Sequence, residues 1–265
     1  MSEPFPADRT NRAETIQAWI DLAAAFRCAV RLNMHEGVCN HFSVMLPGRR
    51  HLINPKGTHF ERMTASSLIV IDENGRTLEG TGRPPMTGYH IHTRIHLAHP
   101  SATVVLHLHA PYSTAITAIR GGRVEMVHQN SARFLGEIAY DDHFNGIAVR
   151  TDEGDRMTEA MGGKRILFLA NHGVIVVGRT VAQAFDDFYY LERAYQVSMR
   201  PSSPSEARIC RRRIPTATPA IAPDANEPQS PPVNSMIIIE SRGRILSLGK
   251  TRAGQQWRRG ADRIW

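Results

Sequence analysis

Two histidines, His107 and His109, stand two residues apart at the end of an apolar run. Side chains at positions i and i+2 of a β-strand lie on one face, roughly 7 Å apart, so both imidazoles can reach a single metal ion. A strand also holds the pair rigidly, as a metal site requires. The alternative is two polar side chains on the exposed face of an edge strand. However, Val104, Val105 and Leu106 do not alternate with polar residues, which favours a strand buried on both faces and histidines that have partners.

A third ligand is suggested by His172, which stands between Asn171 and Gly173 with an apolar run on either side. One interpretation is a bulge that directs the histidine at a site. A tight turn with a surface histidine is an equally good interpretation of the local pattern. Three neutral imidazoles with one open position are the ligand set of a catalytic zinc site, and manganese, iron or cobalt also accept three nitrogens.

Residues 10–199 contain helical and strand patterns that would position these histidines. Thr10 can cap a helix that keeps a 3.6-residue apolar period from Ile16 to Met34. Further helices are expected at 87–98, after Pro111, at 152–161 and at 181–199. Strands are expected at 42–46, 51–54, 68–72, 103–109, 124–128, 147–150, 166–170 and 174–177, and the polar residues 140–143 are typical of a loop. This mixture, without regular βαβ units, favours a layered α/β domain with a mixed or mainly antiparallel sheet.

The net charge of +7 lies wholly in the last part of the chain. Residues 1–199 hold 20 basic and 20 acidic residues, whereas residues 200–265 hold 12 and 5. A basic tail alone does not indicate a nucleic-acid partner, so none is expected. The tail also holds 8 of the 16 prolines and none of the 13 histidines, which predicts disorder with at most a local hairpin around residues 241–243. A natural flexible tail and a reading frame shifted near Ser198 are both open hypotheses.

Several functional classes are disfavoured by composition. Three cysteines do not make a disulfide framework, no run of eighteen apolar residues could span a membrane, and the polar first residues lack a secretory signal. These observations favour a protein of the reducing cytoplasm without a membrane partner.

Several segments, in a fixed order from about Trp19 to Gln196, resemble the class II aldolase/adducin family. They are GVCNHFS at 37–43, INPKG at 53–57, MTASSL at 63–68, the stretch from His99 to Pro111 with its HLHAP, and NHG at 171–173. The resemblance implies a three-layer α/β/α fold with a central, mainly antiparallel sheet. It also implies a homotetramer with active sites at subunit interfaces. The family's metal triad falls on His107, His109 and His172, the same residues that spacing selects.

The resemblance also implies a set of substrate-binding residues. In sugar-phosphate aldolases of the family three loops cradle the phosphate, and only some of their donors remain in this sequence. The corresponding residues, which we expect to bind the substrate, are Asn40, Ser43, Lys56, Gly57 and Thr87.

The family's catalytic glutamate is missing. Its place, 19 residues before the first histidine of the pair, is taken by Gly88, which cannot exchange a proton. Tyr89 could serve as the acid if a metal lowered its pKa, and His92 matches a histidine common in the family. A tyrosine that the neighbouring subunit supplies in such aldolases falls at His128. We therefore expect catalytic roles for Tyr89, His92 and His128.

These features favour a metal-dependent carbon–carbon lyase, an aldolase or decarboxylase of a small oxygenated carbonyl substrate. The divalent metal, zinc in the first instance, would act as a Lewis acid and stabilise the enediolate left when the bond breaks. Dehydration at the same metal is a close variant. An adducin-like binding or scaffold domain without catalysis is the alternative from another class, and Gly88 favours it. A decayed paralogue is the third hypothesis, favoured by the tail.

Overall fold

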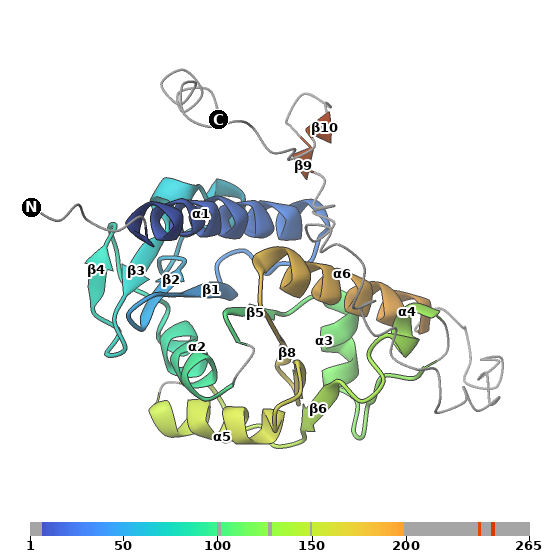
Figure 1. The fold of residues 1–265 in the computed structure, drawn as a ribbon. Coiled ribbons are helices and arrows are strands. Elements are labelled where there is room, and N and C mark those ends of the chain that lie inside the picture. The colour runs from blue at the N-terminus through green and yellow to red at the C-terminus, as the bar shows by residue number, and fades with distance from the viewer. Residues whose placement is uncertain are drawn as a thin grey trace, which may run out of the picture. The chain divides into compact units, whose positions relative to one another are not determined.

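A computed structural model describes residues 7–99, 102–126, 129–148, 150–198, 238–239 and 245–246. The chain divides into two compact units, residues 1–222 and 223–265. In the first unit an eight-stranded sheet lies between two layers of helices (Figure 1). The three-layer α/β/α architecture expected from the sequence is thereby confirmed.

The strands of this sheet follow the order β4-β3-β2-β1-β5-β8-β7-β6. Their bounds are β1 His41–Leu46, β2 Arg50–Ile53, β3 Ile69–Ile71, β4 Thr77–Glu79, β5 Val104–Leu108, β6 Ile138–Asp141, β7 Ile166–Leu169 and β8 Gly173–Gly178. All neighbouring strands pair antiparallel except β6 and β7, which are parallel. The sheet is therefore mainly antiparallel, and β5, which contains His107, lies in the middle of it.

The helices fall into two layers. The bounds are α1 Ala7–Arg31, α2 Met86–Ala98, α3 Pro111–Thr117, α4 Gln129–Ala132, α5 Thr151–Met161 and α6 Val181–Ser198, with short 3-10 helices η1 Phe60–Arg62 and η2 Ala65–Ser67. Helices α1 and α6 cover one face of the sheet, and α2 and α5 cover the other (Figure 1). The short α3 and α4 contact α6.

Strand alternation divides the side chains between these layers. Phe42 stacks on Phe26 of α1 with ring centroids 4.5 Å apart, whereas the flanking His41 and Ser43 make hydrogen bonds to α2. The α2 and α5 layer also buries apolar side chains, with Ile91 among those that are fully buried. Each such side chain contributes about 1.5–3 kcal/mol relative to exposure.

Two of the expected strands are wrong, and two strands were not expected. Among the described residues, 124–126 and 147–148 belong to no strand, because Val124 donates its N–H to the Tyr140 hydroxyl and Ala148 packs into the core beneath α2 and α5. The polar cluster at 140–143 contains the end of β6, which pairs with β7. Strands β4 and β6 carry too few buried apolar residues for alternation to identify them.

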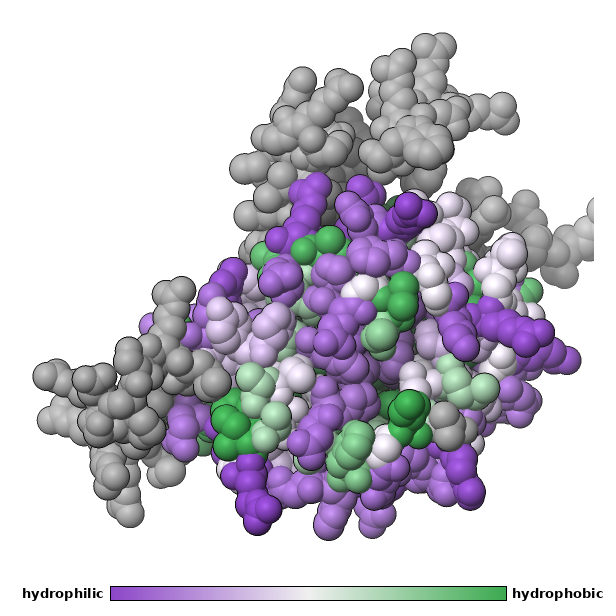
Figure 2. All heavy atoms as spheres, turned by 180° about the vertical axis from the view of Figure 1, so that it is seen from behind, coloured by the Kyte–Doolittle hydropathy of each residue, from purple (hydrophilic) through white to green (hydrophobic). Residues whose placement is uncertain are grey.

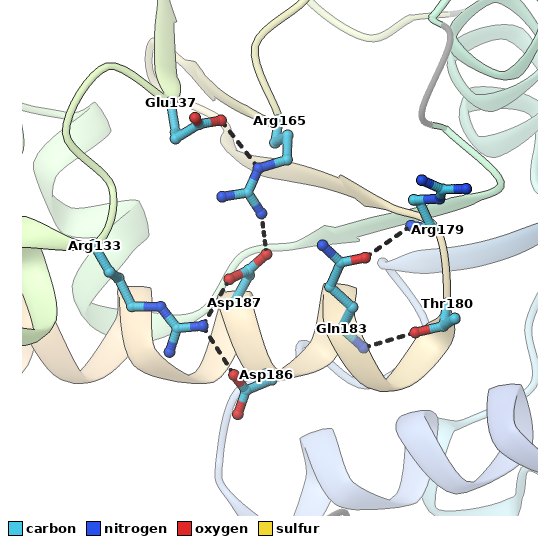
Figure 3. Close-up of polar contacts among 8 residues, drawn as sticks. All are labelled: Arg133, Glu137, Arg165, Arg179, Thr180, Gln183, Asp186 and Asp187. Atoms are coloured by element: carbon cyan, nitrogen blue, oxygen red, sulfur yellow. Dashed lines mark hydrogen bonds and ion pairs between the residues drawn. The ribbon is translucent and has the colours of Figure 1, made fainter. Parts of the chain in front are cut away.

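The first turn of α6 and its buried acid are fixed by polar contacts (Figure 3). Thr180 Oγ1 accepts the backbone N–H of Gln183 at 3.1 Å, which satisfies one of the free donors at the start of the helix. Asp187, buried on the same helix, accepts hydrogen bonds from Arg133 at 3.0 Å and from Arg165. Because removing one partner of a buried ion pair is costly, this network ties α6 to the edges of β6 and β7.

The described part of the second unit is two short strands, β9 (Ile238–Ile239) and β10 (Ile245–Leu246). They pair antiparallel on either side of residues 241–243, as the sequence predicts; the rest of the tail, with its expected disorder, lies outside the described residues. No helix within the described residues has the length and apolar content to cross a bilayer. On the face drawn in Figure 2 the described hydrophobic side chains are dispersed among hydrophilic ones.

Gly154 allows α5 to approach α2 closely. A Cβ at this position would lie 2.1 Å from the His90 backbone oxygen and 2.9 Å from Arg94 Cγ. We therefore expect Gly154→Ala to separate the two helices and to lower the free energy of unfolding by about 1–3 kcal/mol in urea denaturation. Glu159→Ala, at an exposed position of the same helix, is the matched control and should change it by less than about 0.5 kcal/mol. Equal midpoints for the two variants would contradict this close packing.

Candidate metal centre

Three imidazoles from neighbouring strands meet at one end of the sheet. His107 lies in β5, His109 directly follows it, and His172 lies in the turn between β7 and β8. One ring nitrogen of each histidine lies within 4.8 Å of those of the other two, and the Nε2 atoms of His107 and His109 are 3.0 Å apart. His107 is fully buried, and the other two are half-buried, so the cluster opens to solvent on their side. The structure therefore brings together the three histidines that the sequence selected.

The second ring nitrogen of two of these histidines is held by an acceptor. His107 Nδ1 donates to the Val174 carbonyl at 3.1 Å, and His109 Nδ1 donates to Glu36 Oε2 at 2.6 Å. A carbonyl or carboxylate oxygen can only accept, so Nδ1 of both rings carries a proton and Nε2 is the nitrogen that faces the cluster. The two Nε2 atoms face each other across 3.0 Å. This arrangement is repulsive unless a cation or a proton lies between them.

The segment that carries His172 is a hairpin turn, not a bulge. His172 N donates to the Leu169 carbonyl at 3.2 Å, which closes the turn, and Asn171 adopts a left-handed conformation with φ of 53°. A Cβ on Gly173 would lie 2.6 Å from His109 Cδ2. Glycine is therefore required here, because any side chain would push the turn away from β5.

Burial favours the neutral form of two of the three rings, His107 and His172. It lowers the pKa of His107 well below its ordinary value, and neighbouring His172 and His41 lower it further. Burial, with His109 beside it, lowers the pKa of His172 to about 4, although Glu153 and Glu36 oppose the shift. Neutral imidazole is the form that binds metal, so the site is ready for a cation at neutral pH.

A chain of buried hydrogen bonds lies behind the cluster. The His41 ring stacks on His107 with centroids 4.8 Å apart, and His41 Nδ1 lies 2.8 Å from His92 Nε2. Ser43 Oγ lies 2.6 Å from His92 Nδ1 and 2.7 Å from His96 Nε2. The two ends of the chain are the contact of His96 Nδ1 with the Ala102 carbonyl at 2.5 Å and the contact of His41 Nε2 with Thr87 Oγ1 at 3.1 Å.

The expected substrate-binding residues are placed unevenly. Ser43 is fully buried in this chain, because alternation places it inside, under α2. Asn40 is also fully buried, and its Oδ1 accepts the Glu36 N–H at 3.0 Å. Thr87 is half-buried and hydrogen-bonded to His41, whereas Lys56 and Gly57 are exposed. Substrate binding by these five residues stays a prediction.

The expected catalytic residues do not gather at the histidine cluster. The Tyr89 ring packs on Ile53 and Ile71, and its hydroxyl donates to the Glu73 carbonyl at 3.3 Å, so it is engaged by the turn before β4. His92 uses both ring nitrogens in hydrogen bonds of the buried chain. Neither nitrogen is free to exchange a proton with a substrate or to bind a metal. His128 lies outside the described residues. A catalytic role for Tyr89 or His92 is therefore not supported by these contacts.

The position of the missing glutamate is occupied by the neighbouring ring. A Cβ on Gly88 would lie 3.0 Å from His41 Cγ, tighter than an ordinary contact, so a side chain there would displace His41. Two residues of the site, His41 and Glu36, are not predicted from the sequence. His41 lies in the GVCNHFS segment, but only the β1–β5 register shows that it stands directly opposite His107. Glu36 meets His109 only through the fold, and no local pattern marks it.

Glu36 should tune metal affinity through His109. Loss of a carboxylate that orients a ligand histidine typically costs 10–100-fold in metal affinity. We expect Glu36→Gln to weaken zinc binding by about that factor, measured by competition with a chromophoric chelator, because an amide oxygen orients the ring without the negative charge. Glu61→Gln, at an exposed acid nearby, is the control. Unchanged affinity in Glu36→Gln would show that this hydrogen bond is irrelevant to the site.

His51 should make the fold sensitive to acid. Both its ring nitrogens are buried, and they have no hydrogen-bond partner among the described residues; burial lowers its pKa to about 4. The unfolded chain binds a proton near pH 6.5 and the folded chain only near pH 4, so stability is complete above pH 6.5 and falls as the pH drops toward 4. At pH 7.5 the free energy of unfolding of His51→Leu should therefore equal or exceed that of wild type. Between pH 7 and pH 5 it should fall by about 2 kcal/mol less than that of wild type.

The measurement is urea denaturation of wild type and His51→Leu at several pH values. His143→Gln, at an exposed position, serves as the control and should leave the profile unchanged. Parallel profiles for His51→Leu and wild type would refute the assignment.

Comparison with known proteins places the chain in a family. The family model described as Class II Aldolase and Adducin N-terminal domain matches residues 20–199. A putative aldolase class 2 protein of Caulobacter vibrioides is 36% identical over 183 residues, which cover 67% of this chain and 70% of that protein. Human beta-adducin is 34% identical over 152 residues, which cover 56% of this chain and 20% of that protein.

Among solved structures, the L-fuculose 1-phosphate aldolase from Glaciozyma antarctica PI12 superimposes with a TM-score of 0.64 at 28% identity. The match covers 75% of this chain and 77% of that one. The resemblance seen in the sequence motifs is confirmed. The chain belongs to the family of class II aldolase and adducin N-terminal domains.

Proposed function

We propose that this chain is a metal-dependent carbon–carbon lyase, an aldolase or decarboxylase acting on a small oxygenated carbonyl compound. The observation that carries the proposal is the close approach, 3.0 Å, of the Nε2 atoms of His107 and His109. Each opposite nitrogen is fixed by an acceptor. Nitrogens held in this way are oriented for a cation, and a divalent metal relieves their repulsion.

The donor set fits zinc, with manganese, iron or cobalt as the other candidates. The three ring nitrogens lie within 4.8 Å of one another, so a single ion could contact all three. His107, His109 and His172 would hold the ion. When bound, it supplies a Lewis acid that polarises a carbonyl and stabilises an enediolate.

Residues of the chain around the triad would prepare the site. Glu36 orients His109 and remains half-exposed, its side chain 56% accessible. The half-buried Thr87 hydroxyl borders the His41 ring that stacks on His107. A small substrate entering from the side of His109 and His172 would thus meet the metal ligands directly.

A non-catalytic binding or scaffold domain, as in the adducin branch, is the second candidate. It is favoured by Gly88, where the close His41 ring leaves little room for a side chain, and by the likeness to human beta-adducin. A scaffold, however, has no need for the hydrogen bonds that orient His107 and His109 toward one point.

Three further predictions belong with the lyase proposal. A homotetramer would let His128 of one subunit act at the triad of another. A domain spanning residues 10–199, with residues 200–265 as an appended tail, would carry the activity. A cytoplasmic location would keep Cys28 and Cys39 reduced, in agreement with their free thiols in the described part of the chain.

Metal content decides between the two functions. Untagged protein should contain about one divalent ion per chain by elemental analysis, and His109→Ala should contain almost none because the ion loses one of three ligands. His143→Ala, an exposed histidine, is the matched control and should keep its metal. Loaded protein should then cleave members of a panel of hydroxy-aldehydes and keto acids.

Two outcomes would defeat the lyase proposal. Absence of metal after reconstitution would leave the scaffold function. Cleavage that persists in His109→Ala would show that the triad is not the site of reaction.

A further inference from the structure

Helix α3 begins almost directly after His109, and its first turn has no cap of its own. Ala110 stands at the capping position and is fully buried, and it has no side chain that accepts a backbone N–H. Pro111, the first residue of the helix, has no N–H to satisfy. The N–H groups of the next two residues, Tyr112 and Ser113, therefore need an acceptor from elsewhere in the fold.

Glu192 of α6 is that acceptor. Its Oε1 accepts the Tyr112 N–H and its Oε2 accepts the Ser113 N–H, each at 2.8 Å. Glu192 is only 6% exposed, and a buried carboxyl group is costly unless its oxygens are hydrogen-bonded. Most helices satisfy these donors with a local side chain. Here the acceptor comes from a helix distant in sequence that packs against α3 (Figure 1), so the start of α3 is tied to α6.

The place of His109 depends on this tie. The strand pairing that holds β5 ends before this residue: β1 pairs with β5 as far as His107, and β8 pairs with it as far as Leu108. The backbone of His109 is therefore held by β5 on one side and by the first turn of α3 on the other. A metal site needs its ligands within about 0.5 Å of the productive geometry. A shift of that first turn would thus reach the ring that has to meet the ion.

We propose that Glu192 is a positioning residue of the metal centre: it fixes the first turn of α3 and thereby holds His109 in place against the other two histidines of the cluster. The inference rests on the proposed metal-binding function and deepens it. Glu36 orients the His109 ring through Nδ1, whereas Glu192 acts on the main chain that follows the same residue. Two acids, one before β1 and one near the end of the domain, would thus hold one ligand.

Glu192→Gln tests the role with little change of shape. A glutamine side chain has one oxygen and one NH₂ group where glutamate has two oxygens. One of the two N–H groups of α3 keeps its acceptor, and the other faces a donor. The first turn of α3 therefore has to move or to lose a hydrogen bond, while the rest of the contact between α3 and α6 is kept.

Asp187 provides a matched control on the same helix. It is also buried, and it accepts hydrogen bonds from Arg133 and Arg165 (Figure 3). Asp187→Asn makes the same change from acid to amide, but it does so at the contacts of α6 with these two arginines and not at α3. A general loosening of α6 would appear in both variants, whereas a loss of positioning would appear in Glu192→Gln alone.

The first experiment uses the metal-free protein. Amide hydrogen exchange is measured over residues 109–114, and spectra of ¹⁵N-histidine-labelled protein report the His109 ring. Glu192→Gln should exchange about fivefold faster at Tyr112 and Ser113, the effect of one lost hydrogen bond, and should shift the His109 ring signals. Asp187→Asn should match wild type in both measurements. Wild-type exchange and ring signals in Glu192→Gln would overturn the proposal.

The second experiment measures the metal itself. Zinc affinity is determined by competition with a chromophoric chelator, and the visible spectrum of bound cobalt reports the ligand geometry. Glu192→Gln should weaken zinc binding about tenfold, as for other residues that orient a ligand, and should change the cobalt spectrum. Asp187→Asn should match wild type in both. Equal losses of zinc affinity in the two variants would show a general effect of α6 and would refute the positioning role.

The two experiments keep this proposal separate from the lyase function. If wild type binds no metal, the lyase proposal fails, whereas the metal-free measurements still decide whether Glu192 holds His109. If wild type and Glu192→Gln bind zinc equally well, the positioning role is wrong while the metal centre stands.

Discussion

A buried imidazole nitrogen is costly without a partner, and the hydrogen bonds of His41, His92 and His96 organise the space between α2 and the sheet, with His51 as the exception among the described residues. The register of β1 and β5 places His41 directly opposite His107, so two rings that would otherwise need solvent stack against each other. His41 then takes its partner from α2, and the chain passes through Ser43 to a backbone carbonyl. Each ring nitrogen of this chain has a contact, and the polar interior is held in one arrangement. The proposed metal ligands depend on that arrangement, because His107 stacks on His41.

Two glycines let the histidines come this close. At Gly88 the absence of a side chain leaves room for the His41 ring, and at Gly173 it lets the hairpin turn approach His109. In both cases the glycine is selected by space, since neither has the positive φ for which turns usually require glycine. The space given up at Gly88 is the place where a catalytic side chain is expected by resemblance. Gly88 therefore removes a catalytic side chain and at the same time makes room for the His41 ring, which packs against His107.

The local sequence pattern predicted the features that depend on nearby residues. The i, i+2 spacing identified His107 and His109, and apolar periodicity identified the helices that cover the sheet, because burial of one face dictates both. Strand β6 was not predicted, because an edge strand needs no strict alternation of apolar and polar residues. The strand predicted at 147–150 was wrong, because Ala148 fills a core position without strand pairing. Glu36 and the inward position of Ser43 depend on contacts between residues far apart in sequence. Only the three-dimensional register brings such residues together. The family resemblance placed Ser43 among the substrate-binding residues and did not indicate its buried position.

The inner histidines also limit where a proton can come from. Burial lowers the pKa of His41 to about 3, with nearby His172 adding to the effect, and the chain behind it ends at a carbonyl that has no proton to give. Tyr89 is engaged by Glu73. Under the proposed lyase function, a product that must be protonated would therefore receive its proton from the open side of the cluster, where Glu36 is half-exposed beside His109. The buried histidines would orient the site, and protons would be exchanged on the side of His109 and His172. This difference follows from which ring nitrogens can reach water.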